Sequence, residues 1–169
     1  MSESEMSVGR GRALLEETAW LHQAGQVCPE GLPMTAAVAI AEGVDSPTLC
    51  ELAGLSRDAD PRDIHDAFEQ SLAELGIALP DQNLARRFAL RKLAERVIEG
   101  VTALDELASD DWWEVDTETA QEREFVALIP QCTCCIEYAL GLDQEAWESQ
   151  LRIAAVALAS SPMIGPDGR

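Results

Sequence analysis

The chain has 169 residues, the length of one ordinary domain, and apolar residues make up 47% of it. This apolar content, with a charged fraction of 25%, excludes the disordered and collagen-like classes of sequence. The 12 Lys and Arg residues against 31 Asp and Glu residues leave a formal net charge of -19. Such a charge repels phosphate backbones and anionic lipid surfaces, so the composition disfavours nucleic-acid binding and membrane binding.

The features of the sequence that report on location point to the cytoplasm. No stretch approaches the roughly 20 apolar residues of a membrane-spanning helix. The residues from Met1 to Glu5 lack the basic and apolar regions of a signal peptide. The 5 cysteines are an odd number in a chain long enough to fold by packing, so we expect them to be reduced.

Helix start and stop signals recur along the whole chain, and no alternating segment is long enough to indicate a strand. In chain order these signals predict helices at about 11–26, between Pro33 and Gly43, between Ser46-Pro47 and Gly54, over 61–75, at 82–99, from Thr102, at 117–129, within 131–140 and at 144–159.

The helix over 61–75 has the clearest limits. Asp60 is a capping carboxylate before a proline at the first helical position, Pro61, and Gly76 supplies a left-handed stop. Taken together, the signals predict an all-α fold, a single-domain bundle of about seven to nine helices. The helical domain is expected to span 10–160, with a flexible N-terminus over 1–9 and a flexible tail over 161–169.

Two of the predicted helices are apolar on more than one side. In the last helix Trp147 and Leu151 belong to one apolar seam, while Ile153 and Val156 lie on the opposite side. The segment from Met34 to Ala41 is apolar all round but too short to cross a bilayer. We therefore expect neighbouring helices to surround both.

Basic charge is concentrated in one stretch of the chain. Residues 1–80 carry 14 acids and 4 bases, a net -10, and residues 101–169 carry 14 acids and 3 bases, a net -11. Residues 81–100 carry 3 acids and 5 bases, a net +2. Arg87 and Arg91 lie near one edge of the buried stripe of this helix. They either pair with acidic neighbours or, if they face a cleft, form an anion-binding site.

The segment around Trp112 and Trp113 has the composition of an interaction site. Two indoles lie among carboxylates, and large aromatic anchors inside a polar rim are typical of binding hot spots. The alternative is that one or both tryptophans fill a gap between helices. The predicted partner-binding residues are Asp110, Asp111, Trp112, Trp113, Glu114 and Asp116.

Three clustered thiols, Cys132, Cys134 and Cys135, raise the question of a zinc or iron–sulfur site. Their spacing fits such a site poorly, because one short helix would direct Cys134 away from the other two. Free cysteine is among the most buried residue types, so we interpret the three as small buried hydrophobes. No metal or cofactor is expected.

His22, His65 and Asp66 invite comparison with the helical HD phosphohydrolases, whose metal site uses a histidine, then an adjacent His-Asp pair, then a later aspartate. Asp105, Asp110 or Asp116 would be the last ligand, and the metal would activate water against a phosphoester. However, His65 falls at the edge of the core arc of helix 61–75 and Asp66 on its solvent side.

The sequence favours a non-enzymatic binding protein over an enzyme. A surplus of carboxylates speeds encounter with cationic surfaces, so a basic protein partner is the natural ligand, and the protein is expected to be immunity-like or regulatory. The first alternative is the metal-dependent phosphohydrolase. The second is a helical small-ligand sensor with an apolar pocket lined by Met34, Trp147 and Leu151.

The run from Gly43 to Leu55 (GVDSPTLCELAGL), followed by Asp60-Pro61 and by LAELG over 72–76, resembles small acidic helical proteins of high-GC bacteria that carry no assigned activity. The resemblance covers residues 43–100 and consists of helix caps, leucines and glycines. It implies one helical domain in the cytoplasm and transfers no catalytic residue and no ligand.

Overall fold

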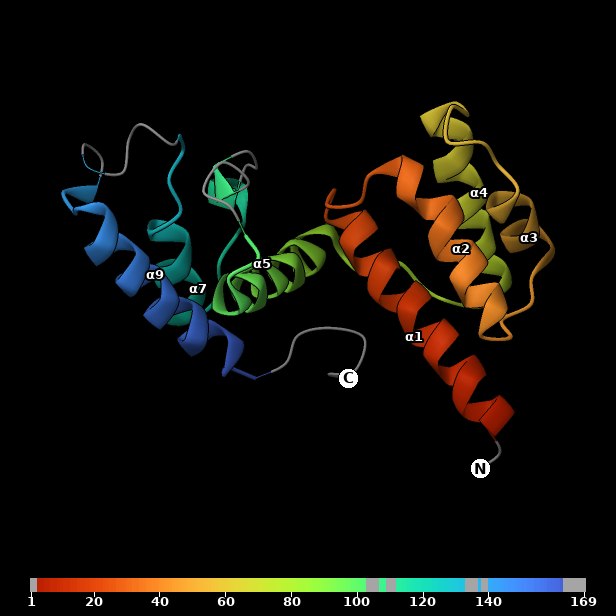
Figure 1. The fold of residues 1–169 in the computed structure, drawn as a ribbon, viewed down its shortest axis with the longest axis horizontal. Coiled ribbons are helices and arrows are strands. Elements are labelled where there is room, and N and C mark those ends of the chain that lie inside the picture. Colours follow the sequence, from red (N-terminus) through yellow and green to blue (C-terminus); the bar gives the residue numbers. More distant parts are fainter. Residues whose placement is uncertain (1–2, 103–106, 109–111, 133–136, 138–139, 163–169) are drawn as a thin grey trace. The chain divides into compact units, whose positions relative to one another are not determined.

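The computed structural model describes residues 3–102, 107–108, 112–132, 137 and 140–162, and every regular element in these ranges is helical. The all-α class is therefore confirmed, with seven α-helices in the described part of the chain (Figure 1). The elements are α1 (Glu3–Gln23), η1 (Pro29–Gly31), α2 (Leu32–Ala41), α3 (Pro47–Ala53), α4 (Pro61–Glu74), α5 (Gln82–Glu99), η2 (Trp112–Glu114), α7 (Ala120–Ala127) and α9 (Gln144–Ala159).

Contacts between residues divide the chain into two compact units, and the division falls inside α5, between Ala85 and Arg86. The first unit contains α1 to α4, and the second contains most of α5 with η2, α7 and α9. Among the helices that the structure describes, none combines the length and the apolar character needed to cross a bilayer.

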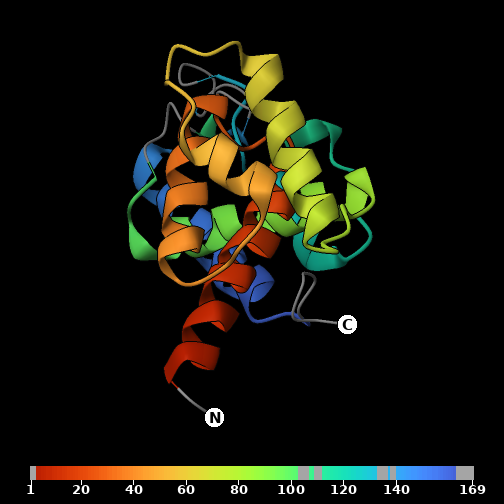
Figure 2. The ribbon, with the colours of Figure 1, turned by 90° about the vertical axis from the view of Figure 1, so that its right-hand side faces the viewer.

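In the first unit, α2, α3 and α4 pack together and α1 lies along α2 (Figures 1 and 2). Each helix contributes one apolar side to a common core, as expected for amphipathic helices that bury a single stripe. The buried core residues are Leu15, Ala19, Leu32, Ala36, Ala39, Val44, Leu49, Leu52, Ile64, Phe68, Leu72 and Ile77.

The start of α3 is tied to the end of α4 by Glu74. The Ser46 hydroxyl accepts from the Leu49 amide at 3.3 Å and donates to Glu74 Oε2 at 2.5 Å. The same carboxylate accepts from the amide of Thr48 at 3.2 Å and from the Thr48 hydroxyl. These hydrogen bonds, first that of Ser46 and then that of Thr48, hold the pKa of Glu74 below its ordinary value.

Helix α1 begins at Glu3, so the predicted start near residue 11 is wrong, and residues 3–9 of the predicted flexible N-terminus are helical. Tertiary contacts explain the extension. The Ser7 hydroxyl donates to Glu42 Oε2 at 2.6 Å, and Gly11 lies against the end of α2. A Cβ at Gly11 would lie 2.8 Å from Val44 Cγ2, so the approach of the two helices needs a glycine there.

In the second unit α7 packs against α9, and the Trp147 indole N–H donates to the carbonyl of Leu128 at 2.7 Å. Helix α7 begins at Ala120 rather than at 117, because Thr119 is its N-cap and forms a capping box with Glu122. Helix α7 ends at Ala127, before the predicted 129.

The predicted limits of α5 and α9 are confirmed, and that of α4 holds to within one residue. The predicted helices from Thr102 and within 131–140 fall largely on 103–106, 133–136 and 138–139, outside the described residues. So does most of the predicted flexible tail, from residue 163 onward. The expected domain limits at 10 and 160 stay predictions.

The expectation that α2 and α9 are surrounded by neighbours is wrong. In α9, Trp147 and Leu151 are buried, but Ile153 is 68% exposed and Val156 is 47% exposed. In α2, Met34 and Val38 are exposed in the same way. Among the residues that the structure describes, each of these two helices packs against its neighbours through one side and leaves the other side exposed.

Candidate functional site

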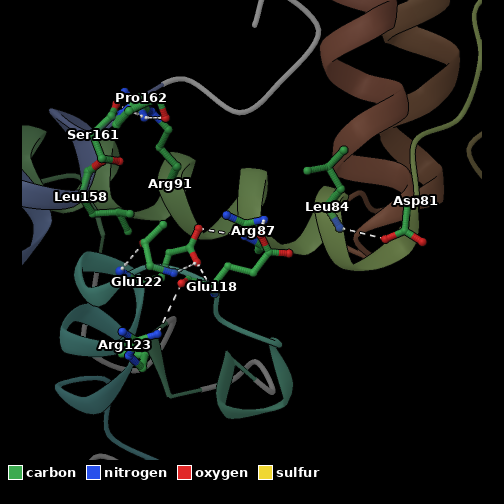
Figure 3. A network of polar contacts seen from close by, with 11 residues as sticks. Asp81, Leu84, Arg87, Arg91, Glu118, Glu122, Arg123, Leu158, Ser161 and Pro162 are labelled. Carbon is green, nitrogen blue, oxygen red and sulfur yellow. Dashed lines mark hydrogen bonds and ion pairs between the residues drawn. The ribbon is translucent and has the colours of Figure 1, made fainter. Parts of the chain in front are cut away.

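The predicted cationic pair on α5 begins with Arg87, whose side chain is 8% exposed. Its Nη1 lies 2.6 Å from Glu118 Oε2, and its Nε donates to Glu122 Oε1 at 2.9 Å (Figure 3). Two carboxylates, one of them buried, therefore bind this guanidinium. Of the two possibilities predicted for Arg87, the structure shows the pairing with acidic neighbours.

Glu122 joins α5 to the first turn of α7. Its second oxygen, Oε2, accepts from the amides of Glu118 at 2.8 Å and Thr119 at 3.1 Å, while Oε1 faces Arg87. Burial raises the pKa of Glu122, but the two amides and the Arg87 guanidinium together outweigh burial and hold the pKa below its ordinary value. The carboxylate is thus charged at neutral pH although it is buried.

Arg91, one turn further along α5, closes the end of α9. Its guanidinium donates to the carbonyls of Ala159, Ser161 at 2.7 Å and Pro162 at 3.1 Å (Figure 3). Ala159 is the last residue of α9, and its carbonyl has no partner within the helix, while Ser161 and Pro162 follow the helix. Arg91 therefore satisfies one orphan carbonyl of α9 and holds the segment that leaves it. Both arginines of the predicted anion site are therefore engaged by groups of the second unit itself.

The two neighbouring tryptophans have opposite environments. Trp112 is 5% exposed, as the gap-filling alternative predicts, whereas Trp113 is 59% exposed. Glu114 and Asp116, which follow them, are also exposed. Asp110 and Asp111, the remaining predicted partner-binding residues, lie outside the described residues. Within the described residues, the predicted site therefore consists of the exposed indole of Trp113 and the exposed carboxylates of Glu114 and Asp116.

The two histidines lie together in the first unit. The ring centroids of His22 and His65 are 4.8 Å apart, and His22 Nε2 lies 3.1 Å from Glu69 Oε1. The nearby carboxylate is thus Glu69, while Asp66 is exposed as the helical wheel predicted. Within the described ranges, no three His, Cys, Asp or Glu side chains are placed to hold a metal ion.

The cysteines divide into two groups. Cys28 and Cys50 are free and exposed. Cys132 is half-buried and takes part in a disulfide, so the expectation of five reduced cysteines is wrong for this residue. An odd count and an assumed compartment do not fix the state of an individual sulfur. Cys134 and Cys135 lie outside the described residues.

A pocket of about 350 Å³ opens in the second unit. Val97, Leu107, Trp147 and Leu151 supply its apolar walls, and Glu145, Glu148 and Arg152 of α9 supply polar groups. Trp147 and Leu151 of the predicted sensor pocket therefore meet at one cavity. Met34, the third residue of that prediction, belongs to the first unit and is 58% exposed.

Sequence reasoning found Arg87 but missed Glu118 and Glu122 as its partners. The available signal was the spacing of Thr119 and Glu122, which is that of a capping box. No protein-family model, curated protein or solved structure matches this chain.

Proposed function

We propose that this is a non-enzymatic acidic binding protein, immunity-like or regulatory, that engages a basic protein partner. The observation that carries the proposal is Trp113, a large apolar side chain left 59% exposed and followed by the exposed carboxylates Glu114 and Asp116. Leaving an indole in contact with water costs free energy, and aromatic residues are enriched at the surfaces where partners dock. A cytoplasmic location remains part of the proposal.

The charge around Trp113 favours a cationic partner. Residues 86–164 carry 15 acids and 7 bases, a net -8, and the whole chain carries -19. Arg87, one of the seven bases, is buried and paired with Glu118 and Glu122 (Figure 3). The exposed charged groups that directly follow the indole in the chain, Glu114 and Asp116, are acidic. They would speed the approach of a basic surface, and the indole would then supply apolar contact area.

The test is capture of native partners on immobilised protein at low and then high salt. A charge-steered complex weakens as ionic strength rises. Trp113→Ala is expected to lose the salt-sensitive partner. Ile153→Ala is the matched control, because Ile153 is a similarly exposed apolar residue of the same unit. Equal capture by both variants, or capture that ignores salt, would contradict the proposal.

The pocket supports a second candidate function, the binding of a small ligand that carries both apolar and polar groups. Its volume of about 350 Å³ falls within the range of small-molecule sites, and Trp147 is fixed there by its hydrogen bond to Leu128. A thermal-shift screen of small compounds that combine apolar and polar groups tests this candidate. Leu151→Trp, which would fill the pocket, is expected to abolish any shift that the natural protein shows.

A further inference from the structure

The outward side of α2 is apolar along its whole length. Met34, Ala37, Val38 and Ala41 are all exposed, and their spacing of three, one and three residues places them on one side of the helix. Met34 is 58% exposed and Val38 is 44% exposed. The opposite side of α2 faces the core of the first unit through Leu32, Ala36 and Ala39. We call the four exposed residues the α2 stripe.

The α2 stripe differs from the solvent-facing side of a neighbouring helix in the same unit. On α4 the exposed positions include the charged residues Asp63, Asp66, Glu69 and Glu74, which is the usual composition of a solvated helix face. Single exposed apolar residues are ordinary, but a continuous apolar helix face marks a surface that another molecule covers.

The surroundings of the α2 stripe are acidic. No Lys or Arg occurs between Arg12 and Arg57, and this interval contains six acids. Four of them flank α2 in the chain or lie on α3, which packs against it: Glu30, Glu42, Asp45 and Glu51. The other two lie on α1, which also packs against α2. Glu42, at the end of α2, already lies 3.7 Å from Arg10 and accepts from Ser7. The exposed acids left for a partner are therefore Glu30 before α2, Asp45 after it and Glu51 on α3.

We propose that the α2 stripe is the docking surface for a basic amphipathic helix of a protein partner. The inference deepens the proposed function, on which it rests, by naming the secondary structure of the partner and a second place of contact. Apolar side chains of the docked helix would cover Met34 and Val38, and its Lys and Arg would pair with the exposed acids Glu30, Asp45 and Glu51. Methionine suits such a surface because its flexible side chain adapts to the partner.

Other occupants fit the charge less well. A second copy would bring two acidic surfaces together, each on a chain of net charge -19. An anionic membrane would repel the same acids. A basic amphipathic helix can cover the apolar stripe with one side and pair its Lys and Arg with the neighbouring acids.

The binding test uses a synthetic amphipathic helix of about 18 residues with leucine on one side and lysine on the other. Calorimetry measures its affinity for the whole chain at about 50 and 300 mM salt. Met34→Gln with Val38→Gln keeps net charge and does not lower helix propensity, but it makes the stripe polar. Ile153→Gln with Val156→Gln is the matched control on α9, where both residues are similarly exposed.

The α2 variant is expected to bind the peptide about tenfold or more weakly than the natural protein, the loss that follows when two apolar contacts are removed. The α9 variant is expected to change affinity less than about twofold. Circular dichroism establishes that both variants keep their helices, as substitution of exposed side chains predicts.

Three results would overturn the inference. The first is salt-sensitive peptide binding that both variants retain equally, which would leave the proposed basic partner standing but remove it from α2. The second is absence of peptide binding, and then the Trp113 capture experiment decides the proposed function separately. The third is a sedimentation mass of two chains that the α2 variant alone reduces to one, which would assign the stripe to self-association.

Discussion

Removal of the buried carboxylate of Glu122 tests how α5 and α7 are held together. Glu122 is 1% exposed and accepts hydrogen bonds from Arg87 and from the amides of Glu118 and Thr119. Breaking a buried ion pair by deleting one partner costs about 3–5 kcal/mol. Because Arg87 keeps Glu118 as a partner, we expect Glu122→Ala to lower the free energy of unfolding by about 3 kcal/mol.

Two further variants separate charge from shape. Glu122→Gln keeps an acceptor for the capping amides but loses the ionic contact with Arg87, so a loss of about 1.5–2 kcal/mol is expected. Glu124→Ala changes an exposed residue of the same helix and is expected to stay within about 0.5 kcal/mol of the natural protein. Urea unfolding followed by tryptophan fluorescence measures all three. An effect of Glu122→Ala no larger than that of Glu124→Ala would refute the role assigned to this carboxylate.

The pH dependence gives an independent check on Glu122. Its pKa in the folded protein lies below the ordinary 4.5, so its contribution to stability is fully present above pH 4.5 and is lost as pH falls through the lowered value. The difference in unfolding free energy between the natural protein and Glu122→Gln should therefore be larger at pH 7 than near pH 3. A difference that does not change with pH would show that the carboxylate is not ionised in the folded state.

Three more predictions concern single contacts. Glu74→Gln is expected to destabilise the first unit at pH 7 and to lose this effect in acid, because the pKa of Glu74 is also lowered; unfolding measured at both pH values checks this. Gly11→Ala should cost about 1–3 kcal/mol through overlap with the end of α2, whereas Gly9→Ala, with nothing within 4 Å of the added carbon, should be neutral or stabilising. Arg91→Ala should cost about 2 kcal/mol and speed amide exchange at the end of α9, and the exposed Arg152→Ala is its control.

Most helix limits could be predicted because their signals are local. Asp60 caps α4 through the amide of Arg62, and Ser46 caps α3 through that of Leu49, as their place before a proline indicates. Prediction failed where distant contacts decide. Helix α1 extends to Glu3 because its first turns contact the end of α2, and neither Gly9 nor Gly11 ends it.

The candidate sites divide in the same way. The sequence singled out Trp112 and Trp113 together, but only the fold buries the first and exposes the second. It placed Arg87 near the edge of a buried stripe. The carboxylates that neutralise Arg87 come from a segment more than 30 residues further along the chain, and Glu122 is 35 residues from it. Spacing along one helix carries no information about which residue of another helix lies opposite.

By itself, the sequence determined the all-helical class, most of the helix ends and the excess of negative charge, because caps, glycine stops and residue counts act within a few positions or over the whole chain. Tertiary structure decided which apolar sides are covered. It left the outward side of α2 exposed and enclosed Arg87 and Arg91. The exposure of a side chain depends on the number and placement of the neighbours that pack against it, and not on the polarity of its segment.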